Sequence, residues 1–576
     1  MRLAPLLIAA LGAVVLFSGL GRVGFVDPGE AQDAAVAREL IDRRELLTPV
    51  LGGEALFDKP LLGYAVEGAG GLLTPGSPLG ARALRAALAL GLVLLTASIG
   101  GQHFGARAGW CAAGVLTTSL ALPLAARIDG VQVLATLLGW VGAAGFADAL
   151  FGRRAGRSGR LVVAYGALAI AMVSAGPLAA LWPIGGLALY LGLASRPDSW
   201  RVIGLSPGLA ILMGLAIPWY GAMVERHGLE FIAHAPFFPY GTAAQGSWLS
   251  APIRALAFLV LGFFPWSTLL PGAAFHAAIW WRAPRRGVLG APRADERPSM
   301  EPIAREHREE SVAHFLIAAL AAGLATLILS PRAPMTAALP ALPAAALLCG
   351  RLLDHLFEDA PRVSGHLASA GRMLALFGST AAVLLALVAA RMREATSDLR
   401  LLAAFLLLAS WAPVLASVRA RHRAAAALLA LPVAVGMPFA TLRLAPAIEV
   451  YLNARAVAEA MEVTAPERAA LVMVDPPPPS LRLYLHRNLV PGEEGISRNR
   501  TREESLSWTL EQFRAQDGLT YVAFRPRSEA WVRRAAPGKL EILARTPGLI
   551  LARASAHLGL AATPVTPAPV VGWTRP

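Results

Sequence analysis

Two short strings near the N-terminus carry the side chains best suited to catalysis. The string DPGE contributes Asp27 and Glu30, and the string FDKP contributes Asp58 and Lys59. A carboxylate can accept a proton from an attacking hydroxyl, and a lysine ammonium is a compact positive charge that suits a phosphate. All four charges fall between two apolar segments, and uncompensated charge next to a bilayer is costly and often functional. These residues are therefore the first candidates for a site.

Lysine usage draws particular attention to Lys59. Lysine occurs only at Lys59 and Lys539 among the 52 basic residues, and arginine fills every other basic position. An arginine guanidinium is a planar fork, whereas a lysine ammonium is a point charge. The retained lysine suggests a position where arginine does not serve, although this usage does not identify a ligand.

The same residues also fit an ordinary helix start. Asp27 suits the N-cap, Pro28 the first helical position and Glu30 the third, which is the spacing of a capping box. The amphipathic stretch Ala31–Arg44 would then lie along the membrane surface. The spacing alone does not choose between a helix cap and a catalytic site.

The composition predicts that most of the chain is embedded in a bilayer. The 576 residues are 56% hydrophobic and 16% charged, whereas soluble proteins carry about 25% charged residues. The mean hydropathy is +0.54. The net charge of +14 does not indicate a nucleic-acid partner, because the arginines cluster in short loops between apolar runs and no nucleic-acid motif accompanies them.

Apolar runs of roughly twenty residues predict about thirteen membrane spans. The runs start near residues 3, 83, 108, 131, 161, 177, 202, 253, 312, 336, 373, 401 and 424. Because basic loops belong on the cytoplasmic side, the N-terminus is expected inside and the C-terminus outside. Three sizeable segments then lie on the outer face, at about 21–80, at about 223–252 and from about 445 onward.

The predicted fold class is an all-α polytopic membrane domain over residues 1–444, followed by a small α/β domain over residues 445–562. The tail 563–576, rich in Pro, Thr and Val, is expected to be disordered. The α/β expectation follows from strand-like runs that alternate with helix-like ones. The strand-like runs are Ala470–Val474, Leu519–Phe524, Leu540–Ala544 and Leu549–Ala552, and the helix-like ones lie near Ser480–Arg487 and Arg502–Ala515.

The first outer segment resembles that of bacterial GT-C membrane glycosyltransferases, the group of lipid A aminoarabinose transferases and protein mannosyltransferase relatives. The strings that carry the resemblance are DPGEAQDAAVAREL, TPVLGG and FDKPLLGY. Later strings are similar in the family's order, among them QHFGARAGWCAAGVLTTSLALPLAARIDGVQV, AGPLAALWPIGGLALYL, PWYGAMVERHGLEFI and FFPWSTLLPGA. The likeness covers roughly the whole membrane region.

The resemblance implies a GT-C-like fold in the bacterial inner membrane, with the C-terminal domain in the periplasm. It implies an enzyme that passes a sugar from a polyprenyl-phosphate carrier to an acceptor on the outer face. The acceptor would be lipid A, another envelope glycan or a protein. A degraded or repurposed, non-catalytic membrane subunit and a transporter or flippase of lipid-linked substrates stay open as alternatives. The last of these would bury charge within its spans, and few charges lie there.

By resemblance, Asp27 or Glu30 would be the acid near the acceptor nucleophile, because Gly29 stands where many relatives carry the first acid of the pair. Asp129 matches an acid in the family's second outer loop. Asp58 and Asp129 would then bind a divalent metal ion or position the sugar phosphate.

The positive charges are expected at the carrier. Lys59 would contact the carrier phosphate. Arg332 stands near a lysine of many relatives and could replace it. Arg85, at the start of the second span, could meet a lipid phosphate or could equally be an interface anchor.

Overall fold

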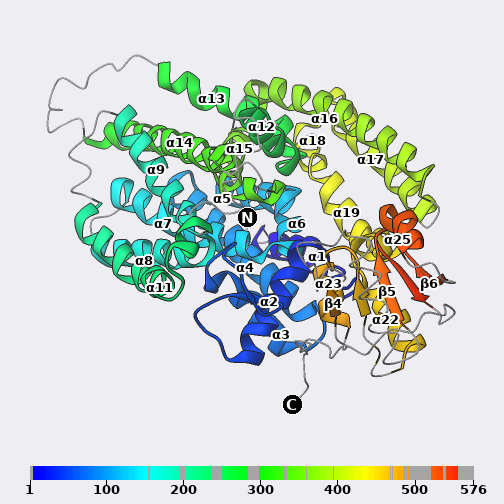
Figure 1. Ribbon diagram of the computed structural model, residues 1–576. Helices are drawn as coiled ribbons and strands as arrows, with labels where there is room; N and C mark the ends of the chain where they lie inside the picture. Colours follow the sequence, from blue (N-terminus) through cyan, green and yellow to red (C-terminus); the bar gives the residue numbers. More distant parts are fainter. Residues whose placement is uncertain are drawn as a thin grey trace, which may run out of the picture.

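Helices make up most of the computed structural model, and a small β-sheet near the C-terminus lies beside them (Figure 1). The structure describes residues 4–152, 156–194, 203–234, 250–282, 297–329, 334–358, 360–392, 395–466, 469, 471–485, 489–491, 520–535 and 540–554. Arg332, the expected helix Arg502–Ala515 and the tail 563–576 lie outside these residues.

Every span expected from the sequence coincides with a helix. Within the described residues, nine stretches are long and apolar enough to cross a membrane, or ten if one bent pair counts as a span. Seven of these stretches each lie within a single helix: α4 (Leu79–His103), α7 (Gly130–Phe151), α8 (Arg157–Ala175), α11 (Leu205–His234), α14 (Arg297–Leu329), α16 (Ala360–Ala389) and α17 (Thr396–Val418). Two spans are composite: η3 (Met335–Ala341) with α15 (Leu342–Glu358), and α18 (His422–Leu428) with α19 (Leu431–Phe439) and the π-helical η5 (Ala440–Leu444).

The remaining expected spans are apolar helices of fewer than eighteen residues. They are α1 (Ala4–Phe17), α9 (Leu178–Leu193) and α12 (Ser250–Gly262), the last followed by η2 (Trp266–Thr268) and α13 (Leu270–Arg282). The apolar composition predicts where these helices lie. It does not predict their length, because turns that hydropathy does not reveal end them early. The chain is thus a multi-pass membrane protein, as predicted.

A bend between α5 (Ala106–Thr117) and α6 (Ala121–Ile128) determines where Asp129 lies. The two helices meet at 57°, and at the break the Leu120 amide donates to the Phe264 carbonyl at 2.9 Å. This bond satisfies a backbone group that the interrupted helix leaves free. Because α6 ends at Ile128 and α7 begins at Gly130, Asp129 occupies the corner between them.

The first outer segment folds as a helix over a shorter helical turn. Helix α2 (Gly29–Arg43) packs on η1 (Leu61–Tyr64) and α3 (Ala65–Leu73), and α3 packs on the start of α4. Val36, Ala37 and Leu40 of α2 bury against Tyr64. This apolar face follows the helical period and turns the acidic residues of the same face inward. A short hairpin, β1 (Val50–Leu51) and β2 (Glu54–Ala55), joins the two parts.

The C-terminal part contains a five-stranded mixed sheet of order β4-β3-β5-β7-β6. Its strands are β3 (Leu471–Met473), β4 (Leu489–Pro491), β5 (Thr520–Phe524), β6 (Leu540–Arg545) and β7 (Ile550–Ala554). Residues of α22 (Arg455–Thr464) and α23 (Pro479–Tyr484) pack on one face, and Val532 of α25 (Glu529–Ala535) packs on the other. Four of the strands match the strand-like runs of the sequence, while β4 was missed.

The three segments expected on one face of the membrane lie together. The guanidinium of Arg226 in α11 pairs with Glu45 at 2.9 Å, and His227 shares a 2.8 Å hydrogen bond with Thr48. On the other side, the Phe25 amide donates to the Tyr484 hydroxyl of α23 at 2.7 Å. The predicted fold class is therefore confirmed.

Two expectations stay predictions. One is the face of the membrane that these segments occupy, and the other is the pair of domain bounds, 445–562 and 563–576.

Candidate active site

Lys59 lies at the centre of a cluster of carboxylates. Its Nζ donates to Asp33 Oδ1 of α2 at 2.5 Å and lies 5.2 Å from the centre of the Tyr64 ring. The neighbouring Asp58 accepts hydrogen bonds from the Tyr64 hydroxyl and, at 3.0 Å, from the Gln32 amide. The Lys59 side chain is 17% exposed and the Asp33 side chain 6%. The ammonium is thus held, but it is not sealed from its surroundings.

Asp129 completes this cluster from the membrane helices. It caps α7 by accepting from the Gln132 amide at 3.1 Å, and its other oxygen accepts from the Thr336 hydroxyl at 2.6 Å. Its charge is close enough to contribute to the pKa of Lys59. The structure therefore brings together Asp58, Lys59 and Asp129, which the sequence placed in two separate outer loops.

The electrostatics of this cluster differ from those of exposed side chains. Burial raises the pKa of Asp33 from its ordinary 3.8 to about 7, with Lys59 opposing the rise and Glu67 and Asp58 adding to it. Burial alone would lower the pKa of Lys59, but the carboxylates of Asp33 and Asp58 outweigh it and raise that pKa above its ordinary range. Lys59 is therefore a stable positive charge, whereas Asp33 is poised to gain or lose a proton near neutral pH.

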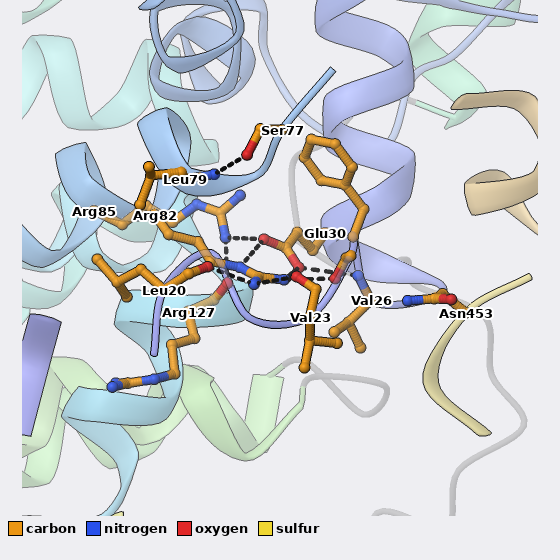
Figure 2. Close-up of polar contacts among 12 residues, drawn as sticks. Leu20, Val23, Val26, Glu30, Ser77, Leu79, Arg82, Arg85, Arg127 and Asn453 are labelled. Carbon is orange, nitrogen blue, oxygen red and sulfur yellow. Dashed lines mark hydrogen bonds and ion pairs between the residues drawn. The ribbon is translucent and has the colours of Figure 1, made fainter. Parts of the chain in front are cut away.

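A second, buried cluster centres on the Glu30 carboxylate (Figure 2). Glu30 accepts from Arg82 Nε at 2.8 Å, from Arg82 Nη2 at 2.6 Å and from Arg85 Nη1 at 2.9 Å. Arg85 also donates to Glu67 at 2.8 Å. Arg82 further donates to the carbonyls of Leu20, Val23 and Gly24, each at 2.8 Å. These bonds tie α2, α3 and α4 to the chain that leaves α1.

The contacts of Glu30 and Arg85 are those of structural residues. Burial alone would raise the pKa of Glu30, but Arg85 and Arg82 outweigh it and lower that pKa. Both side chains have no exposed surface, and the Arg85 guanidinium meets Glu30, Glu67 and the Arg127 carbonyl. The expected proton transfer by Glu30 and phosphate contact by Arg85 stay predictions that these contacts do not favour.

Asp27 faces the C-terminal domain. Its carboxylate accepts from the Ser480 amide at 2.8 Å and from the Ser480 hydroxyl, both at the start of α23. Burial raises the pKa of Asp27, against the lowering effect of these bonds. The expected capping box is wrong: α2 begins at Gly29 with Pro28 at the N-cap position, and no side chain caps it. The Asp27 carboxylate accepts hydrogen bonds from Ser480 and not from the backbone amides at the start of α2.

The expected divalent metal is not matched by the donors of this site. Among the described residues, no group of three or more His, Cys, Asp and Glu side chains could hold a metal ion. Asp58 and Asp129 each accept hydrogen bonds from protein groups, and the Lys59 ammonium lies among them. No chemical step is therefore assigned to a metal, and Arg332 lies outside the described residues.

Sequence reasoning missed Asp33, Glu67 and Arg82. A signal existed for Asp33, because it follows Glu30 by three positions and so shares a helix face with it. Glu67 and Arg82 carried no comparable signal. Glu67 lies in a run of small residues, GYAVEGAGG, and Arg82 in an arginine-rich helix start. Only the packing of the helices shows that Glu67 meets Arg85 and that Arg82 meets Glu30.

The chain is similar in sequence to a bacterial sugar transferase. No family model matches the chain. A curated relative, an undecaprenyl phosphate-α-4-amino-4-deoxy-L-arabinose arabinosyl transferase from Pectobacterium carotovorum, is 26% identical over 264 residues. That stretch is 43% of this chain and 45% of the relative, so the match spans about half of that protein.

Two solved structures share the fold over nearly the whole chain. ArnT from Cupriavidus metallidurans bound to undecaprenyl phosphate matches with a TM-score of 0.71 and 18% identity, covering 97% of this chain and 99% of ArnT. The apo state of the same protein matches with a TM-score of 0.70 and 18% identity, covering 95% and 97%. The GT-C-like fold expected from the resemblance is thereby confirmed.

Proposed function

We propose that this chain is a membrane glycosyltransferase that moves a sugar from a polyprenyl-phosphate carrier to an acceptor at the outer face of the bacterial inner membrane. The observation that carries the proposal is the Lys59 ammonium, held by carboxylates beside the start of the membrane helices in a chain with the ArnT fold. One ArnT structure with this fold contains undecaprenyl phosphate. The same carrier is therefore proposed here.

The chemistry needs opposite properties on the two sides of the anomeric carbon. The departing carrier phosphate gains negative charge, which a lysine ammonium stabilises. The attacking hydroxyl loses a proton, which a carboxylate can accept. The Lys59 cluster supplies both kinds of group within one site. Asp58 and Asp129 orient the sugar phosphate in this proposal, and the acceptor is lipid A, another envelope glycan or a protein.

The test is sugar transfer by the purified chain in liposomes. Undecaprenyl phosphate carrying 4-amino-4-deoxy-L-arabinose is the first donor to try, because the curated relative is named for it. Lipid A, envelope glycans and membrane proteins are offered as acceptors, and mass spectrometry reports the added sugar. A donor-dependent mass increase that needs about 10- to 100-fold more donor with the Lys59→Ala variant supports the proposal.

Two results would overturn it. Donor binding without transfer to any of these acceptors would indicate a non-catalytic subunit. Movement of the donor across the liposome bilayer without transfer would indicate a flippase.

A further inference from the structure

We infer that Asp33 is the catalytic base that takes the proton from the acceptor hydroxyl, and that the carrier phosphate frees Asp33 for this role by binding Lys59. This inference rests on the proposed glycosyl transfer and names one more residue of its site. Sequence resemblance points to Asp27 or Glu30 instead. The contacts of the carboxylates in the first outer segment favour Asp33.

Asp33 differs from its neighbours in how its oxygens are occupied. Among the described residues, its carboxylate receives a hydrogen bond from Lys59 alone. The other carboxylates of the two clusters, and Asp27, each have partners other than Lys59: Glu30 has Arg82 and Arg85, Glu67 has Arg85, Asp27 has Ser480, Asp58 has Tyr64 and Gln32, and Asp129 has Gln132 and Thr336. Asp33 is therefore the carboxylate that loses its partner when Lys59 turns to a ligand.

The position of Asp33 also suits the reaction. Asp33 Oδ1 lies 2.5 Å from Lys59 Nζ, so a phosphate oxygen bound to that nitrogen would lie within a few ångströms of the carboxylate. The anomeric carbon is separated from such an oxygen by only the phosphorus and the bridging oxygen. A base must reach the attacking hydroxyl directly or through one water, and this spacing allows it.

The charges around Asp33 fit a base that works near neutral pH. The charged groups that act on it are Lys59 and Asp58 from the loop before η1, Glu67 from α3 and Arg85 from α4. Burial raises the pKa of Asp33 to about 7 even with Lys59 in contact. A phosphate that draws Lys59 away raises the pKa of Asp33 further, which makes the deprotonated carboxylate a stronger acceptor for the hydroxyl proton.

The step balances without a co-reactant. The acceptor oxygen forms a bond to the anomeric carbon as the bond from that carbon to the bridging phosphate oxygen breaks. The carrier phosphate leaves with the electron pair, and the Lys59 ammonium stabilises the negative charge that it gains. The hydroxyl proton passes to Asp33, which releases it to solvent after the products leave.

The alternative is that Asp33 is only a counter-ion for Lys59. Three variants separate the two roles: Asp33→Asn, Asp33→Glu and, as a control on the exposed side of the same helix, Asp42→Asn. Each is compared with the unchanged chain for kcat against pH and for binding of undecaprenyl phosphate. A base raises kcat by about 100- to 10,000-fold, so Asp33→Asn should lower kcat by that factor.

The dependence of kcat on pH distinguishes a catalytic base from a counter-ion. The unchanged chain should lose kcat as the pH falls through the pKa of Asp33 in the carrier complex, which lies above its value of about 7 in the free chain, because the base becomes protonated. Asp33→Asn should abolish this limb while still binding undecaprenyl phosphate, Asp33→Glu should retain a shifted limb, and Asp42→Asn should match the unchanged chain.

Several outcomes would overturn the inference. An Asp33→Asn variant that weakens carrier binding but keeps kcat and its acid limb would reduce Asp33 to a counter-ion. If Asp33→Asn does not fold, an acid limb that Asp33→Glu leaves unmoved would overturn it equally. Absence of transfer by the unchanged chain would instead defeat the proposed function, so the two failures are distinguishable.

Discussion

Replacing Glu30 with glutamine is expected to destabilise the fold rather than to remove a catalytic base. The Glu30 carboxylate has no exposed surface and accepts from Arg82, from Arg85 and, at 3.0 Å, from the Val26 amide. Glutamine keeps the shape of the side chain but removes its charge. Arg85 retains Glu67 as a partner. Arg82 then has only neutral acceptors, the glutamine oxygen and the carbonyls of Leu20, Val23 and Gly24.

The magnitude follows from leaving Arg82 as a buried cation without a carboxylate. Breaking a buried ion pair by removing one partner costs about 3–5 kcal/mol. The Asp42→Asn control acts on an ion pair with Arg38 in which both side chains are half exposed, and such surface pairs contribute about 0–1 kcal/mol. The two changes on one helix should therefore differ by several kcal/mol.

Unfolding can be followed by labelling a thiol that is buried in the folded chain. Cys349 in α15 is fully buried, whereas Cys111 is partly accessible. In a Cys111→Ser background, a thiol-reactive dye labels Cys349 only when the membrane domain opens. Heating detergent-solubilised Glu30→Gln should expose Cys349 at a clearly lower temperature than heating the unchanged chain or Asp42→Asn.

The effect should also depend on pH. Because its folded-state pKa is lowered from 4.5, Glu30 stabilises the fold fully above that value and loses this contribution as the pH falls through the folded pKa. The gap between the unchanged chain and Glu30→Gln should shrink in acid. A Glu30→Gln variant of unchanged stability that has lost all transfer would refute this reasoning and restore Glu30 as the base.

Three further predictions follow from other contacts. Lys59→Ala should weaken donor use by about 10- to 100-fold, because a charge-assisted contact is worth roughly 1.5–3 kcal/mol. Lys59→Arg should restore donor use only in part. An alanine variant with an unchanged donor-dependence curve would end the phosphate assignment. Ser480→Ala should loosen the contact between α23 and Asp27 by about 1 kcal/mol, seen as faster hydrogen exchange at the start of α2, whereas Ser528→Ala within the C-terminal domain should not. A reporter fused after Pro576 should be active only in the periplasm, and activity confined to the cytoplasm would reverse the topology.

The sequence was sufficient for the membrane architecture because hydropathy is a local property. Each span is an apolar run whose backbone must satisfy its own hydrogen bonds in lipid, so a window of about twenty residues contains the necessary information. The strands β3, β5, β6 and β7 were found for a similar reason, since alternating and apolar runs reveal them. The missed strand β4 is three residues long and has too little pattern of its own.

The candidate site was only partly determined by the sequence. Residue type and usage identified Asp58 and Lys59, the family resemblance identified Asp129, and the structure brings the three together. Sequence spacing left Asp27 between a helix cap and a catalytic acid, but the tertiary structure pairs it with Ser480, more than 450 positions away. No local pattern can anticipate a contact over that separation.

What only tertiary structure decided is which carboxylate is bound by which cation. Glu30 and Asp33 are three positions apart on one helix and look equivalent in the sequence. Packing of α3 and α4 places two arginines on Glu30 and a single lysine on Asp33. A buried carboxylate held by two arginines stays charged, whereas burial with weaker compensation raises the pKa of the other toward neutrality. The sequence determined which charged residues lie at this membrane edge, and the three-dimensional arrangement of the helices assigned their partners.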